Sequence, residues 1–158
     1  MQTVNLICVG KLKEEYLRAA QAEYEKRLSA FCRLKLIEVP KHRLPSEPSP
    51  AQIEQGTAVE GKIILQKCRG SLIALCIEGK ELSSLELASL LEKRAMNGES
   101  ELSFVIGGSY GLSPEVKNAS SQRLSMSPMT FPHQLARIML LEQLYRAYSI
   151  NGNGKYHK

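Results

Sequence analysis

The chain has 158 residues, 43% hydrophobic and 23% charged, so we expect one packed domain over residues 1–158. Its 21 Lys and Arg residues outnumber its 16 Asp and Glu residues, which suits a polyanionic partner without requiring one. No stretch approaches the roughly 20 apolar residues of a membrane span, and no charged region precedes the short apolar run at the N-terminus. We therefore expect a cytoplasmic protein that does not contact a membrane.

Short apolar runs alternate with stretches of helical periodicity along the whole chain. Capping boxes that begin at Ser49 and Ser83 mark the starts of two helices. This alternation predicts an α/β fold with a mostly parallel sheet and helices on both faces. The predicted strands are residues 4–9, 34–39, 71–77, 102–106 and 123–127, and the predicted helices are residues 14–28, 50–67, 84–96, a short one from 114, and 132–150.

The cysteines do not form a metal-binding or redox motif, because Cys8, Cys32, Cys68 and Cys76 have no CxxC spacing and no nearby histidine. We expect reduced, mostly buried thiols and no metal site. Six basic residues surround the second strand, where Glu38 is the single acid. They predict a basic surface or, alternatively, an ordinary solvated face: Lys26, Arg27, Arg33, Lys35, Lys41 and Arg43.

Ligands of open α/β sheets collect beyond the carboxyl ends of the strands, here residues 75–79, 107–111 and 126–131. The glycines of GGSYG at 107–111 would let a ligand approach the backbone, although a plain tight turn explains them equally well. The motif matches neither GxGxxG nor a P-loop and lacks a phosphate-binding lysine. A nicotinamide- or triphosphate-dependent enzyme is therefore disfavoured.

The last predicted helix is almost entirely apolar, with Thr130 as a candidate cap and Pro132 in the first turn. Its apolar arc is wider than one sheet face needs, and the opposite, polar face carries Glu142, Gln143, Arg146 and Ser149. Arg137 falls inside this arc. Because a guanidinium stays charged, its burial would require an anionic or carbonyl partner, either as a core fixture or as part of a site.

Several segments together resemble one known family. They are LICVGKLKEEYLRAAQAEYEKRL at 6–28, FVIGGSYGL at 104–112, LSMSPMTFPHQLARIMLLEQLYRA at 124–147 and YHK at 156–158. The combination is similar to the RlmH family, bacterial methyltransferases acting on N3 of a pseudouridine in 23S ribosomal RNA. This family belongs to the SPOUT superfamily. The resemblance covers the whole chain.

The resemblance implies a C-terminal trefoil knot, a homodimer, S-adenosylmethionine as cofactor, and 23S rRNA or the ribosome as partner. The connection rules for ordinary folds would not predict a knot. Carried over to this sequence, the cofactor positions fall on Leu75, Gly107, Met126, Ser127, Pro128, Met129, Thr130 and Phe131. These positions coincide with the three loops beyond the strand ends.

Methylation of a weakly acidic imide nitrogen needs alignment with the sulfonium and either a base or a cation that stabilises the developing oxyanion. The catalytic candidates are His133, Arg137, Tyr156 and His157, the last two in a tail that we expect to be flexible when free, with Lys158 as a phosphate contact. Alternatively, His133 is a helix-start residue bonded to nearby backbone, and His157 is merely exposed. A non-catalytic RNA- or ribosome-binding module on the same fold is the rival function.

Overall fold

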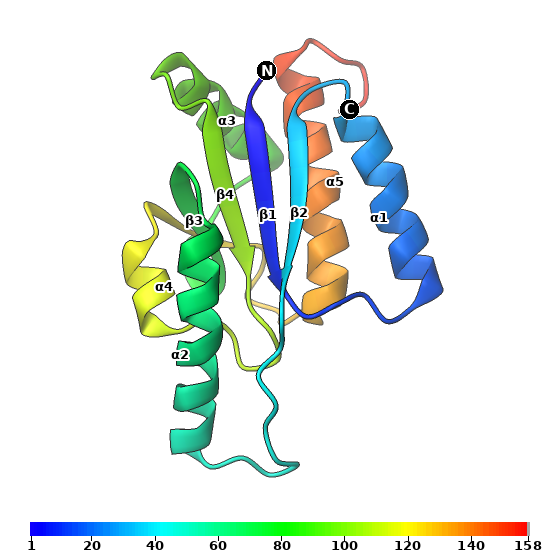
Figure 1. The fold of residues 1–158 in the computed structure, drawn as a ribbon. Coiled ribbons are helices and arrows are strands. Elements are labelled where there is room, and N and C mark those ends of the chain that lie inside the picture. The colour runs from blue at the N-terminus through cyan, green and yellow to red at the C-terminus, as the bar shows by residue number, and fades with distance from the viewer. Residues whose placement is uncertain (158) are drawn as a thin grey trace.

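The computed structural model describes residues 1–157 and contains a five-stranded sheet in which all paired strands are parallel, in the order β2-β1-β4-β3-β5 (Figure 1). The strands are β1 (Thr3–Val9), β2 (Arg33–Val39), β3 (Ser71–Glu81), β4 (Glu101–Ile106) and β5 (Gln122–Ser125). The helices are α1 (Glu15–Leu28), α2 (Pro50–Lys67), α3 (Ser84–Met96), α4 (Pro114–Ala119) and α5 (His133–Asn151). The predicted α/β class is confirmed.

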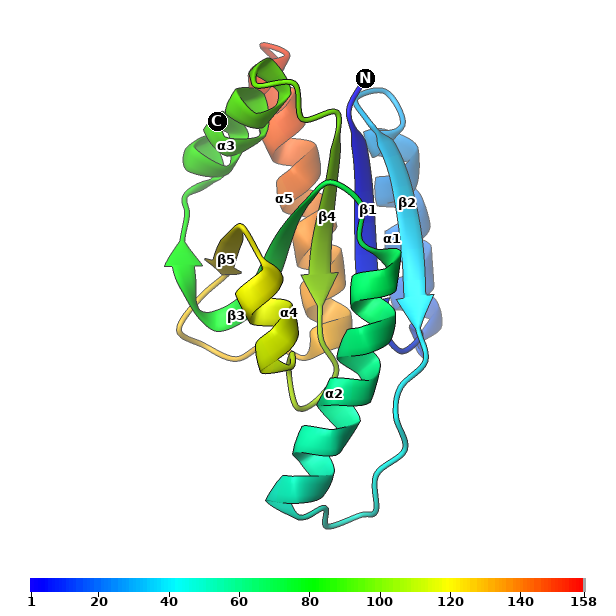
Figure 2. The ribbon, with the colours of Figure 1, turned by 60° about the vertical axis from the view of Figure 1, so that its left-hand side comes forward.

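The sheet has a hydrophobic core on each face. Leu6 of β1 and Phe104 of β4 belong to the core under α1, α3 and α5, whereas Ile7 and Val105 belong to the core under α2 and α4. Alternate residues of a strand point to opposite faces of the sheet. Because helices cover both faces, consecutive residues of β1 and of β4 are buried. Figures 1 and 2 show the two helical layers. No helix among residues 1–157 is long and apolar enough to cross a membrane.

Local signals placed most helix starts correctly. The Ser49 hydroxyl accepts the backbone N–H of Gln52, whose side chain accepts the N–H of Ser49, which completes the predicted capping box. Thr130, in contrast, does not cap α5, since Pro132 holds that position without a side-chain hydrogen bond. The helical spacing of residues 14–28 predicts that Tyr16 points inward, and this prediction is wrong, because Tyr16 is 69% exposed on α1.

β3 extends four residues beyond its predicted end, with an irregularity before its last part. Leu75 and Lys80 both pair with Leu124 of β5, so the intervening residues bulge out of the ladder. At Gly79, an added Cβ would lie 2.7 Å from the backbone of Arg123 and Leu124, which leaves no room for a side chain. The bulge therefore depends on this glycine, and its residues face the cavity described below.

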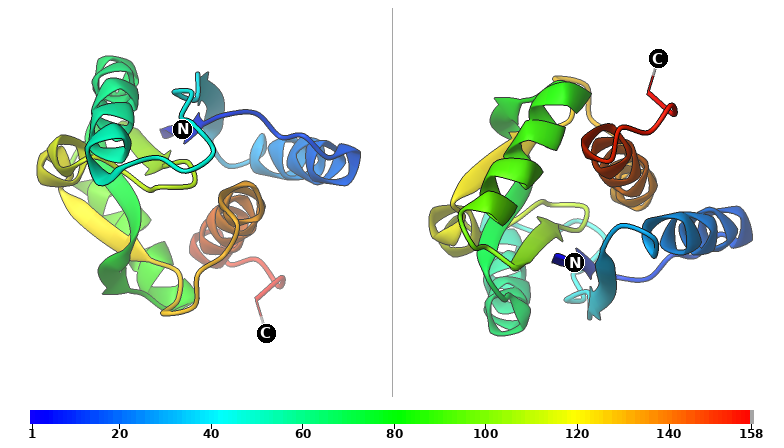
Figure 3. Two further views of the ribbon diagram at one scale, coloured as in Figure 1. Left: turned by 90° about the horizontal axis from the view of Figure 1, so that it is seen from below. Right: turned by 90° about the horizontal axis from the view of Figure 1, so that it is seen from above.

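α5 is covered within this chain. It packs against the sheet between α1 and α3 (Figure 3), and its buried residues include Arg137 and Ser149, the latter expected on the polar side. Every residue from 136 to 151 is at least partly buried. Because α1 and α3 already cover much of the apolar arc, its width alone does not require a dimer.

Candidate functional site

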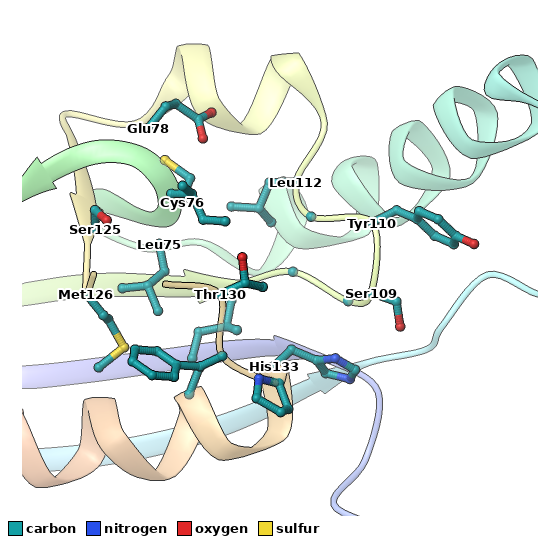
Figure 4. A pocket seen from close by; sticks show the side chains of 18 of the residues that line it. Leu75, Cys76, Glu78, Ser109, Tyr110, Leu112, Ser125, Met126, Thr130 and His133 are labelled. Atoms are coloured by element: carbon teal, nitrogen blue, oxygen red, sulfur yellow. The ribbon is translucent and has the colours of Figure 1, made fainter. Parts of the chain in front are cut away.

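A cavity of about 790 Å³ lies beyond the carboxyl ends of β3 and β4 (Figure 4). The bulge after Leu75, the turn after Ile106 and the loop between β5 and α5 form its walls. This is the edge predicted from the parallel strands, and the volume suits a cofactor-sized ligand.

The turn after β4 is closed by its own backbone. The Gly111 N–H donates to the Gly108 carbonyl at 3.0 Å, and Gly111 has a φ of +77°. A Cβ on Gly107 would lie 2.6 Å from the carbonyl carbon and oxygen of Gly111. These glycines are therefore required by the turn itself, and a side chain at Gly107 would distort the turn before it met a ligand.

The loop from β5 to α5 is braced by short-range hydrogen bonds. The Ser125 hydroxyl donates to the Ser127 carbonyl at 3.2 Å, and the Met129 N–H donates to the Ser127 hydroxyl at 2.9 Å. Thr130 is exposed, and Figure 4 shows its side chain directed into the cavity. The braced loop thus presents the apolar side chains of Met126 and Phe131 to the cavity.

Three titratable side chains on the cavity wall have displaced pKa values, and that of the Cys76 thiol is raised, chiefly by burial. Lys117 Nζ lies 2.6 Å from Glu78 Oε1, and its hydrogen bond lowers the pKa of that carboxyl. The pKa of His133 is lowered from the ordinary 6.5, first by burial and then by the charges of Lys41, Arg137 and Lys13. The neutral imidazole is therefore favoured at pH 7, which suits a proton acceptor.

The structure brings most of the sequence-predicted site residues together. Seven of the predicted cofactor positions line this cavity, and so does His133: Leu75, Gly107, Met126, Ser127, Met129, Thr130 and Phe131. Pro128 lies in the same loop but is exposed and does not line the cavity. Arg137, Tyr156 and His157 do not line it either.

Arg137 is buried near the carboxyl ends of β1 and β2. Its guanidinium donates to Glu38 Oε2 at 2.9 Å, to Gln21 Oε1 at 3.2 Å and to the Gly10 carbonyl at 3.0 Å. The Arg137 side chain is 2% exposed, and its Nε has no partner among the described residues. This geometry favours the reading of Arg137 as a core fixture that joins α5, α1 and β2.

The tail folds back along α5. The Tyr156 hydroxyl lies 3.0 Å from both carboxylate oxygens of Glu142, its ring packs on Tyr145 with centroids 4.8 Å apart, and Arg146 lies over it. Arg146 also lies 3.3 Å from His157 Nδ1. The phosphate contact predicted for Lys158 lies outside the described residues.

A second cavity of about 550 Å³ adjoins the first, and Glu142 is part of its wall. The two cavities share Ser125, Met126 and Phe131. Sequence reasoning missed Glu142 and Arg146 by assigning them to a polar helix face. Their i,i+4 spacing with opposite charge was the available signal, since such pairs meet on a helix.

Comparisons with known proteins agree with this architecture. A family model described as "Predicted SPOUT methyltransferase" matches residues 1–157. Proteins named ribosomal RNA large subunit methyltransferase H from Exiguobacterium sibiricum and Clostridioides difficile are each 48% identical over 157 residues, covering 98% of this chain and 99% of theirs. A solved structure described as a probable methyltransferase from Bordetella pertussis shares the fold, with a TM-score of 0.58 at 15% identity, covering 93% of this chain and 96% of that one.

Proposed function

Because the chain belongs to the SPOUT methyltransferase family, we propose that it transfers a methyl group from S-adenosylmethionine to N3 of a pseudouridine in 23S ribosomal RNA. The names of its full-length relatives support ribosomal RNA of the large subunit as the substrate. The observation that carries the proposal is the cavity bounded by the predicted cofactor loops. A ribosomal substrate would place the protein in the cytoplasm, acting as one domain.

The chemistry of the cavity wall fits S-adenosylmethionine. This cofactor carries no phosphate, and the one lysine of the wall, Lys117, is already paired with Glu78. Leu75, Met126 and Phe131 offer apolar contact for an adenine ring, and residues 107 and 126–131 offer backbone amides and carbonyls. When bound, the cofactor supplies an electrophilic methyl group on its sulfonium.

The protein itself positions the pseudouridine and accepts the proton from its N3. We infer that His133, whose neutral form is favoured, takes the imide proton, since it shares the cavity with the predicted cofactor loops. Tyr156 contacts Glu142 of the adjoining cavity, and His157 lies beside Arg146. We therefore infer that the adjoining cavity receives the nucleobase to be methylated and that the tail contacts it. In this scheme Arg137 supports the fold and does not touch the base.

A homodimer is the proposed working form. Leu85, Met129 and Leu135 are exposed apolar residues, and their segments also contribute Ser84, Phe131 and Ile138 to the wall of the second cavity. Exposed apolar side chains that form one patch are typical of an interface between subunits. A second copy would cover them.

Mass spectrometry of ribosomal RNA from a strain lacking this protein tests the proposed reaction. Loss of one methylated pseudouridine in 23S rRNA, restored in vitro by the purified protein and S-adenosylmethionine, is the expected result. An unchanged modification pattern would contradict it. Calorimetry separates the rival, because a non-catalytic binding module would bind ribosomes without binding S-adenosylmethionine or S-adenosylhomocysteine.

A further inference from the structure

Four cations lie in the loops that leave the carboxyl ends of β1 and β2, and we call them the cationic rim: Lys11, Lys13, Lys41 and Arg43. All four are exposed, and none forms an ion pair within residues 1–157. They follow β1 and β2, which are neighbours in the sheet, so their loops begin at the same edge. The Gly10 N–H donates to the Val39 carbonyl at 2.8 Å, which joins the two loops at their starts.

The rim is tied to the helix start that borders the cavity. The Lys13 N–H donates to Gln134 Oε1 at 3.0 Å, and the preceding residue, His133, lines the cavity. Lys41 and Lys13 are close enough to His133 to lower its pKa. Glu38 is the nearest acid along β2, but its carboxylate is held by Arg137. A polyanion at the rim would therefore lie directly beside the cavity and would not have to displace an internal ion pair.

Tyr110 belongs to the cavity wall and lies in the turn after the strand next to β1. β4 is the neighbour of β1 in the sheet, and Tyr110 occupies the tip of the turn that follows β4. Its side chain is 50% exposed, and Figure 4 shows the ring pointing outward from the cavity mouth. The outward ring and the unpaired cations thus lie in loops at the carboxyl ends of neighbouring strands. Aromatic rings and cations are the groups that proteins use to bind single-stranded nucleic acid, by stacking bases and contacting phosphates.

We propose that the cationic rim and Tyr110 bind the RNA strand flanking the target nucleotide, with the cations on phosphates and the Tyr110 ring stacked on a neighbouring base. This inference rests on the proposed function, because it takes RNA as the substrate. It uses only part of the basic surface predicted around the second strand, whose six basic residues are all exposed. Arg27 pairs with Glu23 near the end of α1, just before β2 begins. Lys41 and Arg43 follow the other end of β2 and belong to the rim together with Lys11 and Lys13 of another loop.

Charge-reversal variants test the rim. Lys11→Glu/Arg43→Glu, which spares the two lysines that lower the pKa of His133, should raise the KM for ribosomes at least about tenfold. It should also reduce the slope of log affinity against log salt concentration by about one to two. The turnover number and the affinity for S-adenosylmethionine should stay within about twofold. The matched control is Lys67→Glu/Lys93→Glu, which changes the net charge by the same amount and should leave the KM unchanged. Both lysines are exposed near the ends of α2 and α3, just before β3 and β4 begin. Equal effects of the two pairs would overturn the proposal.

Tyr110 is tested at the same time. Tyr110→Leu should raise the KM roughly tenfold, as expected for one lost stacking contact, while Tyr110→Phe should match the wild type. Ultraviolet irradiation of the wild-type complex should crosslink the peptide containing Tyr110 to 23S rRNA. A crosslink to ribosomal protein alone would overturn the assignment to RNA.

Failure of the proposed reaction would be distinguishable from failure of this inference. Wild-type protein that transfers no methyl group would contradict the proposed reaction. Co-sedimentation with ribosomes in the absence of cofactor would still measure whether the rim variant binds ribosomes more weakly than the control variant. Active wild-type protein whose rim variant behaves like the control would contradict the rim alone.

Discussion

Arg137 Nη1 lies 2.9 Å from Glu38 Oε2, and this ion pair joins the long C-terminal helix to the edge strand β2. The arginine is almost fully buried, whereas the Glu38 side chain is 39% exposed. The pair therefore holds a permanent charge inside the protein while leaving the carboxylate in contact with water. Its contribution to stability can be measured separately from any contribution to catalysis.

Replacing Arg137 by Ala should lower the free energy of unfolding by about 2–4 kcal/mol, measured by urea denaturation. The loss is smaller than for a fully buried pair, because water can reach the unpaired Glu38. At a temperature where the variant is folded, its affinity for S-adenosylmethionine should match the wild type. Arg27→Ala, at an exposed pair with Glu23, is the control and should barely move the urea midpoint. A stable Arg137→Ala variant with impaired turnover would instead support a role of Arg137 in catalysis.

Thr130→Phe should abolish S-adenosylmethionine binding in calorimetry without lowering stability. The Thr130 side chain is exposed and directed into the cavity, so a larger group fills ligand space and does not displace the core. This position is a cleaner test than Gly107, where any side chain would collide with Gly111. Thr130→Ser, which leaves the cavity open, should bind within about threefold of the wild type. Unchanged affinity in the Phe variant would contradict the cofactor site.

The rate of methyl transfer should fall as pH decreases, with a midpoint below 6.5, because burial and nearby cations lower the pKa of His133. The same shift should lower stability as pH falls below about 6.5, since the unfolded chain binds this proton more readily. An NMR titration of the His133 ring gives the pKa directly. Lys41→Gln should raise it towards 6.5, and a wild-type midpoint at or above 6.5 would contradict the assignment.

Truncation after Lys155 should abolish methylation of ribosomes while reducing the free energy of unfolding by less than about 1 kcal/mol. The removed Tyr156 is 37% exposed and contacts the rest of the protein mainly through Glu142, Tyr145 and Arg146. S-adenosylmethionine affinity should stay within about twofold, because the tail does not line the first cavity. Full activity of the truncated protein would contradict a role of the tail in methyl transfer.

Sedimentation at micromolar concentration should give a dimer, and Leu135→Glu should shift it towards monomer. Leu135 is an apolar residue that is 41% exposed at the start of α5. Met96→Glu introduces the same charge at an 80% exposed position at the end of α3 and should leave the dimer intact. A monomeric wild-type protein would contradict the proposed assembly.

The elements and the position of the candidate cofactor site follow from the sequence, because both depend on local patterns. Periodicity and the Ser49 capping box locate the helices, and parallel strands must end at a shared edge, which gathers residues 75–79, 107–111 and 126–131. The trefoil knot remains a prediction from resemblance.

Contacts between distant segments were decided only by the tertiary structure. The partners of Arg137 lie 99, 116 and 127 residues away along the chain, so its place in an apolar arc could show that it needs partners but not which ones. The docking of Tyr156 on Glu142 and the bulge of β3 at Gly79 depend likewise on packing between α5, β3 and β5. Such contacts depend on strand order and loop path, and hydrophobic periodicity carries no information about either.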